Sequence, residues 1–252
     1  MDLKLNGKVA FIAGASQGIG LAIAETLQNE GARVIITGRD EQRLADAERQ
    51  LGKDCVAILG DLTQEDIIAP TLAEAVKRCG RIDILIANVG SGVMPVKTAY
   101  TPEEWLECFQ KNFLGSMLLT GEFIPYLEKT KGSIIFIASI AGIEGIKAPM
   151  PYAAAKASLL SAMKSLAHQL GKKGIRVNAI SPGNILFPGG RWEEKLKKDK
   201  TAIEEYIACE VPLNRFGTAQ EIADVAAFLA SSKAAFITGA NIVVDGGQTR
   251  SW

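Results

Sequence analysis

Tyr152 and Lys156 are the residues whose types and spacing point most directly to chemistry. Pro151 opens a stretch rich in Ala and Leu that ends at Gly171, and this pattern predicts a helix. Residues four apart lie on one face of a helix, so the phenol and the ammonium group would project into the same space. A nearby cation favours phenolate, so we expect the pKa of Tyr152 to fall below its ordinary value of about 10. Tyr152 would then act as a general acid or base near neutral pH.

The segment 14–20, with the sequence GASQGIG, is a second chemical signal, because it follows an apolar run at residues 9–13. Gly14 permits a tight turn, Gly18 lets a pyrophosphate approach the backbone, and Gly20 allows the next helix to pack closely. This pattern predicts a dinucleotide phosphate site, although an ordinary strand-to-helix turn is the alternative.

Polar residues follow three further predicted strands. Arg39 stands where an NAD-binding chain would carry a carboxylate, so a 2′-phosphate and hence NADP are favoured. Alternatively, Arg39 only begins a solvated helix. Asp61 could accept a hydrogen bond from an adenine amino group, or Asp61 or Thr63 could cap the following helix. Asn88 and Gly90 could line the cofactor cleft or form a plain turn.

The elements that must position these residues alternate between short apolar runs and amphipathic segments. Strands are predicted at residues 9–13, 33–37, 55–59, 83–87, 133–138, 176–180 and 241–244, and helices at 19–30, 41–51, 65–78, 102–128, 152–170 and 220–229. The strands are apolar on both faces, as buried parallel strands are. We therefore expect one α/β domain over residues 1–252. It would be a doubly wound, Rossmann-type, mostly parallel sheet of seven strands with helices on both faces. Ligands of such sheets bind at the carboxyl ends of the strands.

Composition limits the class of partner. The chain has 252 residues with 28 basic and 28 acidic side chains, so no net charge attracts nucleic acid or an anionic membrane. No apolar run approaches the length of a membrane span. The four cysteines have no paired spacing, which argues against a metal site or a disulfide framework and favours the cytoplasm. A small molecule is the expected partner.

Taken in order, these motifs resemble the short-chain dehydrogenase/reductase family from about residue 5 to residue 247. The glycine turn is followed by an Asn88-Val89-Gly90 version of the family's Asn-Ala-Gly turn, and Ser139 lies thirteen residues before Tyr152. Asn112, Lys156 and the pair Pro182-Gly183 complete the pattern, which is specific as a set.

The resemblance implies hydride transfer between a nicotinamide and a carbonyl or alcohol carbon. Tyr152 would donate the proton, Ser139 would hold the carbonyl oxygen, Lys156 would bond the nicotinamide ribose, and Asn112 would hold a water that resupplies the proton. Cofactor contacts are expected from Gly14, Ser16, Gln17, Gly18, Ile19, Gly20, Arg39, Asp61, Leu62, Asn88, Gly90, Tyr152, Lys156, Pro182, Gly183 and Ile185. We expect an NADPH-dependent reductase of a ketone or 3-oxoacyl-like substrate, or the reverse alcohol dehydrogenase.

Two departures from the family pattern affect the cofactor. Phe187 stands where the family often places a Thr near the nicotinamide, and Gln17 stands where NADP users often carry a basic residue. An NAD-linked alcohol or sugar dehydrogenase is therefore an alternative. A dinucleotide-binding regulator without turnover is another, although an intact proton donor argues against it.

Residues 185–211 are expected to form a substrate lid, with a hinge at 188–190 and a short charged helix over 191–200. Trp192 would either cap a hydrophobic substrate or pack the helix on the core. Residues 140–150, including Glu144, Ile146 and Met150, are expected to form the opposite, mostly apolar wall. His168 lies too far along its helix to reach the chemistry, so we interpret it as structural.

Apolar residues on more than one face of the 102–128 and 152–170 helices predict a homotetramer or a dimer. They are Phe113, Leu114, Met117, Leu118, Leu159, Leu160, Met163 and Leu166. The tail at residues 248–252 is expected to join that contact.

Overall fold

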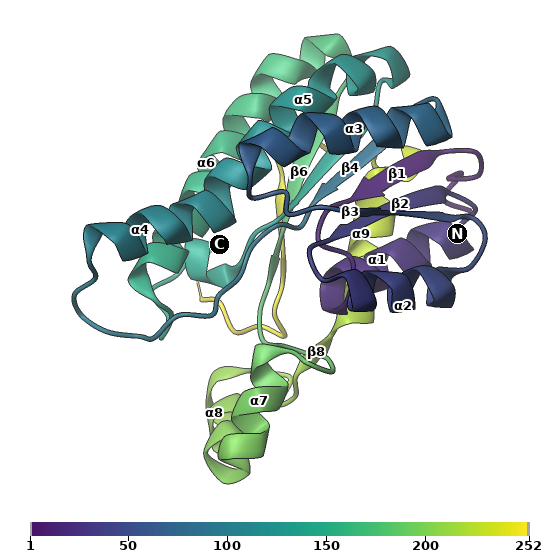
Figure 1. Cartoon of the computed structure of the whole chain (residues 1–252). Coiled ribbons are helices and arrows are strands. Elements are labelled where there is room, and N and C mark those ends of the chain that lie inside the picture. Colours follow the sequence, from purple (N-terminus) through teal and green to yellow (C-terminus); the bar gives the residue numbers. More distant parts are fainter. Residues whose placement is uncertain (1, 251–252) are drawn as a thin grey trace.

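A parallel sheet lies at the centre of the computed structural model, which describes residues 2–250 (Figure 1). Its seven strands have the order β3-β2-β1-β4-β5-β6-β9. They are β1 (Val9–Ile12), β2 (Arg33–Gly38), β3 (Cys55–Leu59), β4 (Ile84–Ala87), β5 (Ser133–Ile137), β6 (Arg176–Pro182) and β9 (Asn241–Val244). The order reverses between β1 and β4, which places a crevice at their carboxyl ends. The predicted doubly wound, Rossmann-type sheet of seven strands is confirmed.

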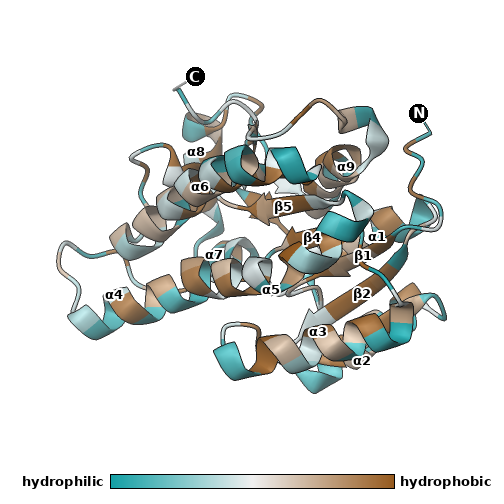
Figure 2. Ribbon diagram, turned by 90° about the horizontal axis from the view of Figure 1, so that it is seen from above, coloured by the Kyte–Doolittle hydropathy of each residue, from teal (hydrophilic) through white to brown (hydrophobic). Residues whose placement is uncertain are grey.

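Helices cover both faces of the sheet, because each central strand sends alternate side chains to opposite sides. Ala10 and Ile12 face α1 (Gly18–Asn29), α2 (Glu41–Leu51) and α9 (Ala219–Ala230). Phe11 faces α3 (Glu65–Cys79), α5 (Gly115–Thr130) and α6 (Met150–Leu170), and its ring centroid lies 4.6 Å from that of Phe123. Figure 2 shows the apolar strands between helices that carry both apolar and hydrophilic residues. The core therefore forms two apolar layers, one on each face of the sheet.

The long helix predicted over residues 102–128 is interrupted. A capping box at Thr101 starts α4 (Pro102–Phe109), and a π-helical turn, η1 (Gln110–Leu114), separates α4 from α5. The Asn112 side chain donates to the Cys108 carbonyl oxygen at 3.0 Å, so a side chain replaces part of the regular helical bonding there. Short 3₁₀ turns follow β5 (η2, Ile140–Gly142), α6 (η3, Gly171–Lys173) and α9 (η4, Ser232–Ala234).

Two helices leave the carboxyl edge of the sheet and project away from it (Figure 1). They are α7 (Arg191–Lys198) and α8 (Lys200–Glu210), and they lie between the two-residue strands β7 (Ile185–Leu186) and β8 (Gly217–Thr218), which pair with each other. The predicted helix over 191–200 ends at Lys198, and α8, β7 and β8 were not predicted. We call residues 185–218 the α7–α8 segment.

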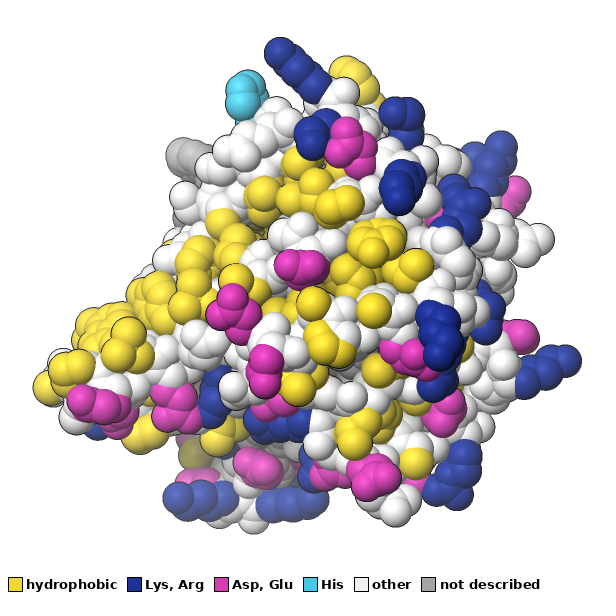
Figure 3. All heavy atoms as spheres, turned by 45° about the horizontal axis from the view of Figure 1, so that its top comes forward, with side chains coloured by type: hydrophobic (Ala, Val, Ile, Leu, Met, Phe, Trp, Pro, Cys, Tyr) yellow, Lys and Arg dark blue, Asp and Glu magenta, His cyan; other side chains and the backbone are white. Residues whose placement is uncertain are grey.

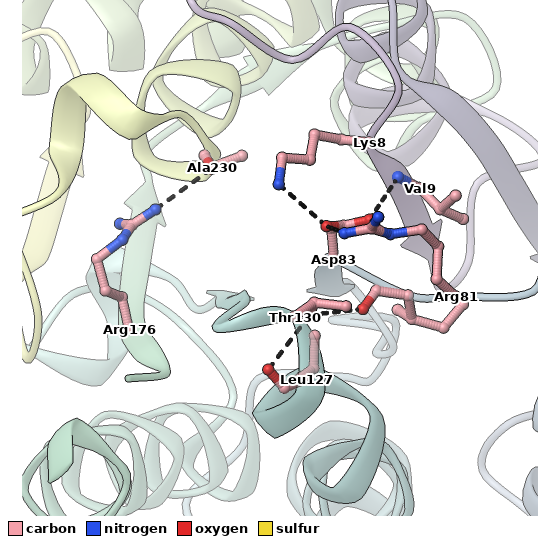
Figure 4. Close-up of polar contacts among 9 residues, drawn as sticks. Lys8, Val9, Arg81, Asp83, Leu127, Thr130, Arg176 and Ala230 are labelled. Carbon is pink, nitrogen blue, oxygen red and sulfur yellow. Dashed lines mark hydrogen bonds and ion pairs between the residues drawn. The ribbon is translucent and has the colours of Figure 1, made fainter. Parts of the chain in front are cut away.

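A buried carboxylate joins strands at the opposite edge of the sheet. Asp83 accepts hydrogen bonds from the Val9 main-chain N–H, from Lys8 at 3.1 Å, and from Arg81 at 2.6 and 2.8 Å. Figure 4 shows Lys8 and Arg81 both directed at this carboxylate. These contacts fix the start of β1 beside the start of β4, and thereby the relative position of the two loops at their other ends.

Within residues 2–250, none of the helices combines the length and the apolar character that crossing a bilayer requires.

Candidate functional site

A cavity of about 450 Å³ opens at the carboxyl ends of the strands, beside the α7–α8 segment. Most of the predicted site residues line it. They are Gly14, Ser16, Gln17, Ile19, Arg39, Asp61, Leu62, Asn88, Gly90, Asn112, Ser139, Tyr152, Lys156, Pro182, Gly183 and Ile185. Gly18 and Gly20 do not line it and form the turn behind. The structure thus brings together in one cavity residues from the ends of six strands with Asn112 of η1 and Tyr152 and Lys156 of α6.

The glycine turn at one end of the cavity has the backbone that a phosphate site needs. Gly14 and Gly18 have φ values of 65° and 59°, in the left-handed region that favours glycine. A Cβ on Gly20 would lie 2.4 Å from the Gly14 carbonyl oxygen, so only glycine permits this close packing. Asn88 donates to that same oxygen at 2.9 Å and fixes the turn against β4. No side chain caps α1, which leaves its first N–H groups available to an anion.

Phe187 lies directly over this turn. A Cβ on Gly18 would lie 2.6 Å from the Phe187 ring, and a Cβ on Gly190 would lie 2.8 Å from it. The ring therefore occupies space beside the backbone that the sequence predicted to be open to a pyrophosphate.

The region expected to hold the adenosine contains one cation that sequence reasoning missed. Arg43 donates to the Gln17 side-chain oxygen at 3.1 Å and lies 3.6 Å from Asp40, so its guanidinium reaches from α2 to the glycine turn. Its place in the first turn of the helix after Arg39 was the available signal. Arg39 itself lines the cavity.

Asp61 lies in a turn closed by its own side chain. Its carboxylate accepts from the Thr63 N–H at 3.0 Å and from the Thr63 hydroxyl at 2.8 Å. Helix α3 begins at Glu65 with Gln64 as its N-cap. The alternative in which Asp61 or Thr63 caps α3 is therefore wrong, and Asp61 remains at the cavity wall.

Tyr152 and Lys156 lie one turn apart on α6, as predicted, with the Lys156 Nζ 5.9 Å from the centroid of the Tyr152 ring. Lys156 is 4% exposed and donates to the Ile137 carbonyl oxygen at 2.8 Å. Ser139 caps η2 by accepting from the Ala141 N–H at 3.2 Å. The bond from Lys156 to Ile137 joins α6 to the carboxyl end of β5, just before Ser139 and its loop.

The electrostatics of the pair differ from the prediction. Burial raises the pKa of Tyr152, while the Ser139 hydroxyl and the charge of Arg191 pull that pKa down. Burial also lowers the pKa of Lys156 to about 8. The predicted lowering of the Tyr152 pKa by Lys156 is thus wrong in this structure, because both groups are withdrawn from water. The phenol is held in its protonated form.

The Asn112 amide is engaged at both ends. Its oxygen accepts from the Ser91 N–H at 2.9 Å, and its nitrogen donates to the Ser91 and Cys108 carbonyl oxygens at 3.1 and 3.0 Å. A Cβ on Gly90 would lie 2.6 Å from the Asn112 oxygen and 3.4 Å from the Lys156 Nζ, so both groups border Gly90. Asn112 joins η1 to the loop after β4 beside the Lys156 ammonium group.

The wall opposite the glycine turn differs from the expected one. Residues 90–93 and 187, 189–192 line the cavity, and no described residue of the 140–150 segment does. Ile143 and Met150 are 38% and 48% exposed. The predicted apolar wall is therefore wrong, because this segment turns outward after η2. His168 is exposed near the end of α6 and does not line the cavity either.

Trp192 belongs to an aromatic cluster within the α7–α8 segment. Its ring stacks on Tyr206 with centroids 5.6 Å apart and meets Phe216 at 5.5 Å, while one side of it lines the cavity. Gln248 donates to the Tyr206 hydroxyl at 3.1 Å and accepts from Asn184 at 2.8 Å. The expectation that the tail joins another subunit is not tested here: Gln248 is buried against α8, and residues 251–252 lie outside the described part.

Arg191 is a cavity residue that the sequence did not single out. Its guanidinium donates to the Gly92 carbonyl oxygen and, at 3.5 Å, to the Met94 carbonyl oxygen. It therefore spans from the start of α7 to the loop after β4.

Cys55, Cys79, Cys108 and Cys209 are free thiols. Among residues 2–250, no group of three or more His, Cys, Asp or Glu side chains is arranged to hold a metal ion.

Known proteins are similar to this chain in sequence and architecture. A family model described as enoyl-(acyl carrier protein) reductase matches residues 14–249. L-fucose dehydrogenase from Bos taurus is 36% identical over 250 residues, covering 98% of this chain and 91% of the relative. 3-oxoacyl-(acyl-carrier-protein) reductase from Escherichia coli (strain K12) is 37% identical over 247 residues, covering 98% and 99%.

Solved structures of other proteins have the same fold. L-sorbose reductase from Gluconobacter frateurii, solved with NADPH and L-sorbose, superposes with a TM-score of 0.93 at 32% identity over 100% of both chains. The chain therefore belongs to the short-chain dehydrogenase/reductase family of NAD(P)-dependent oxidoreductases.

Proposed function

We propose that the protein is an NADPH-dependent reductase of ketones, able to run in reverse as an alcohol dehydrogenase. The observation that carries this proposal is the meeting of Ser139, Tyr152 and Lys156 in the cavity that also holds the glycine turn. A carbonyl oxygen placed between the Ser139 hydroxyl and the Tyr152 phenol would have a hydrogen-bond partner and a proton donor before charge develops on it.

We propose that a dinucleotide would lie along the cavity once the Phe187 ring moves away from the glycine turn. The glycine turn and the free end of α1 would hold the pyrophosphate, Asp61 and Leu62 the adenine, and Asn88, Gly90, Lys156, Pro182, Gly183 and Ile185 the nicotinamide half. When bound, NADP would supply the hydride for the carbonyl carbon, or accept it in the reverse direction.

The chain's own groups would supply a proton for the reductive reaction at neutral pH. Burial raises the pKa of Tyr152, so its phenol carries the proton that a developing alkoxide needs. Lys156, within reach of both Tyr152 and Gly90, would supply positive charge beside that phenol once the proton has left. The Asn112 oxygen accepts one hydrogen bond and has a second acceptor site, so it could still hold the water that resupplies the proton.

The choice of NADP over NAD rests on the cations at the adenosine end. Arg39 lines the cavity and Arg43 reaches the glycine turn, and guanidinium groups recognise phosphate through paired hydrogen bonds. The NADPH complex of the related L-sorbose reductase supports the same choice.

Fluorescence titration with NADPH and NADH tests this choice. Tighter NADPH binding is expected, and Arg39→Ala and Arg43→Ala should each reduce that preference by about tenfold or more. Arg49→Ala, on the exposed part of α2, is the control and should leave it unchanged. Tighter NADH binding would instead support an NAD-linked alcohol or sugar dehydrogenase.

A panel of ketones with NADPH, followed by absorbance, tests the activity itself. Tyr152→Phe should abolish turnover of any substrate found while leaving NADPH affinity within about threefold, because the phenyl ring keeps its place. Cofactor binding with no turnover of any carbonyl or alcohol would favour the non-catalytic regulator.

We further propose that the whole chain forms one cofactor-binding and catalytic domain with residues 185–211 as its lid. The hinge at 188–190 contains Gly189 with a φ of 73°. The free thiols and balanced charge are consistent with the cytoplasm. Substrate-dependent protection of 185–211 from proteolysis would test the lid.

A homotetramer or dimer is also proposed, on the evidence of apolar side chains left at the surface. Leu106, Leu114 and Leu118 are 70%, 41% and 36% exposed, and Figure 3 shows apolar side chains gathered on the side where α4 and α6 lie in Figure 1. Leu159 and Met163 instead belong to the core, because they face the sheet. A monomer by light scattering would contradict this proposal.

A further inference from the structure

Arg191 places a positive charge at the substrate end of the cavity. It is the first residue of α7, directly after the proposed hinge, and its guanidinium contacts the main-chain carbonyl oxygens of Gly92 and Met94 across the hollow. Both of these partners are uncharged, and the longer contact, at 3.5 Å, is at the limit of a hydrogen bond. The charge of Arg191 is therefore held in place but not neutralised.

Neighbouring cations differ from Arg191 in this respect. Lys197 on the same helix pairs with Glu193 at 2.9 Å, and Lys111 at the cavity wall pairs with Glu107. Among the ion pairs of the described residues, none includes Arg191 or Lys195. Two cations one turn apart on α7 thus lack a carboxylate partner on the face that borders Trp192.

The pKa of Lys195 is affected by the neighbouring positive charges. Its Nζ lies 3.9 Å from the centroid of the Trp192 ring. Burial lowers the pKa of Lys195, and the charges of Arg191 and Lys147 lower it further. Of the charged residues of α7, only Arg191 lines the cavity, so its guanidinium is the group that could attract an anion there.

Arg191 is also close to the reacting position. A Cβ on Gly92 would lie 3.5 Å from the Arg191 Nη1 and 3.6 Å from the Tyr152 Cε2, so the guanidinium and the phenol ring border the same glycine. A substrate whose carbonyl oxygen meets the Tyr152 hydroxyl would bring a group a few bonds away to the guanidinium.

We propose that Arg191 binds a carboxylate of the substrate, and that the substrates are therefore small oxo acids and the corresponding hydroxy acids. The inference rests on the proposed reductase activity and names the substrate class of that site. It narrows the expected ketone substrate to one that carries a carboxylate.

Matched pairs of acids and esters test the inference. Acetoacetate and methyl acetoacetate, and 4-oxopentanoate and methyl 4-oxopentanoate, are each reduced with NADPH, and kcat/KM is measured. The acids should be preferred by about tenfold or more, as expected for a charge-assisted Arg–carboxylate pair. Arg191→Gln should lower kcat/KM for the acids about 10- to 100-fold and leave the esters within about threefold. Arg191→Lys should restore part of the loss.

Lys198→Gln, at the exposed end of α7, is the control and should leave the acid-to-ester ratio unchanged. If Arg191 only clamps α7 to the loop after β4, Arg191→Gln will lower kcat/KM for acids and esters by the same factor. That result, or equal use of acids and esters by the unchanged protein, would overturn the inference while leaving the reductase activity standing.

A binding measurement separates this inference from the proposed activity. Calorimetric titration of 4-oxopentanoate into Tyr152→Phe saturated with NADP⁺ should show binding that is lost when Arg191→Gln is added. If neutral ketones are turned over but no acid binds, the inference fails alone. If no carbonyl is turned over, the proposed activity is wrong. If, in addition, no acid binds, the inference about Arg191 is wrong as well.

Discussion

The side-chain oxygen of Asn112 accepts a hydrogen bond from the Ser91 N–H at 2.9 Å, while its nitrogen donates to the Cys108 carbonyl oxygen at 3.0 Å. One amide therefore holds both the π-helical turn and the loop after β4. That loop carries Gly90 and Gly92, which border Lys156, Tyr152 and Arg191.

Asn112→Ala should loosen both segments at once. Leaving the partners of the amide unpaired should lower the free energy of unfolding by about 1–3 kcal/mol and weaken NADPH binding by about tenfold. Urea denaturation and fluorescence titration measure the two effects. Asn29→Ala, at the exposed end of α1, is the control. Unchanged stability and affinity in Asn112→Ala would show that the amide is not the clamp described here.

Gly18→Ala should weaken cofactor binding through a clash as well as through backbone strain. Gly18 has a φ of 59°, and the added Cβ would lie 2.6 Å from the Phe187 ring. Gly52→Ala is the matched control, since Gly52 has a φ of 77° but nothing within 4 Å of an added Cβ. The Gly18 change should cost about 1–3 kcal/mol more in urea unfolding and should alone lower NADPH affinity. Equal losses in the two variants would contradict the described position of Phe187.

Phe187→Thr should strengthen cofactor binding, because the ring over Gly18 and Gly190 competes with a pyrophosphate for the same space. The expected gain in NADPH affinity is about tenfold, or about 1.4 kcal/mol. Phe236→Thr, which changes a fully exposed phenylalanine, should have no effect on affinity. Weaker binding in Phe187→Thr would mean that the ring contributes to the cofactor site.

Lys156→Met should raise the free energy of unfolding relative to the wild type, and by more at pH 7 than at pH 10. Burial lowers the pKa of Lys156 from 10.5 to about 8. Below pH 8 the buried side chain is charged, which lowers the free energy of unfolding. Between pH 8 and 10.5 the unfolded chain binds the extra proton, so the wild-type protein gains stability as pH rises through that window. At pH 7 the variant should be more stable by up to about 3 kcal/mol, less about 1 kcal/mol for the lost bond to Ile137.

Urea unfolding near pH 7 and near pH 10 measures this difference, which should shrink at the higher pH. Lys164→Met is the control, because Lys164 lies on the same helix and also donates to a carbonyl oxygen, that of Gly239, but is exposed. Lys164→Met should not raise the stability at pH 7, because an exposed ammonium group has no burial cost. A Lys156→Met protein that is less stable than the wild type at pH 7 would rule out the described burial cost.

The sheet could be predicted because buried parallel strands form uninterrupted apolar runs that are separated by helical periods. The run at residues 133–138 corresponds to β5 (Ser133–Ile137), and the predictions for β4 and β6 agree to within one and two residues. The polar residues that follow each strand could then be placed together, since the carboxyl ends of parallel strands share one edge.

Other features depend on contacts that a local pattern does not contain. Residues 102–128 have the hydrophobic periodicity of one continuous helix. The bond from Asn112 to Cys108 that accompanies η1 does not change that periodicity, so the π-helical turn could not be predicted. Strands β7 and β8 have two residues each, too few for any alternation. The spacing of Tyr152 and Lys156 predicted their proximity but not their burial, and burial decides the direction of both pKa shifts.

The aromatic cluster of Trp192, Tyr206 and Phe216 is built within the α7–α8 segment itself. Few polar contacts attach it to the rest of the chain, among them the bond from Gln248 to Tyr206 and those from Arg191 to Gly92 and Met94. Helices that present different side chains to the cavity can therefore replace α7 and α8 without repacking of the sheet. Preference for a new metabolite can evolve in α7 and α8 while the machinery for moving the hydride is inherited intact.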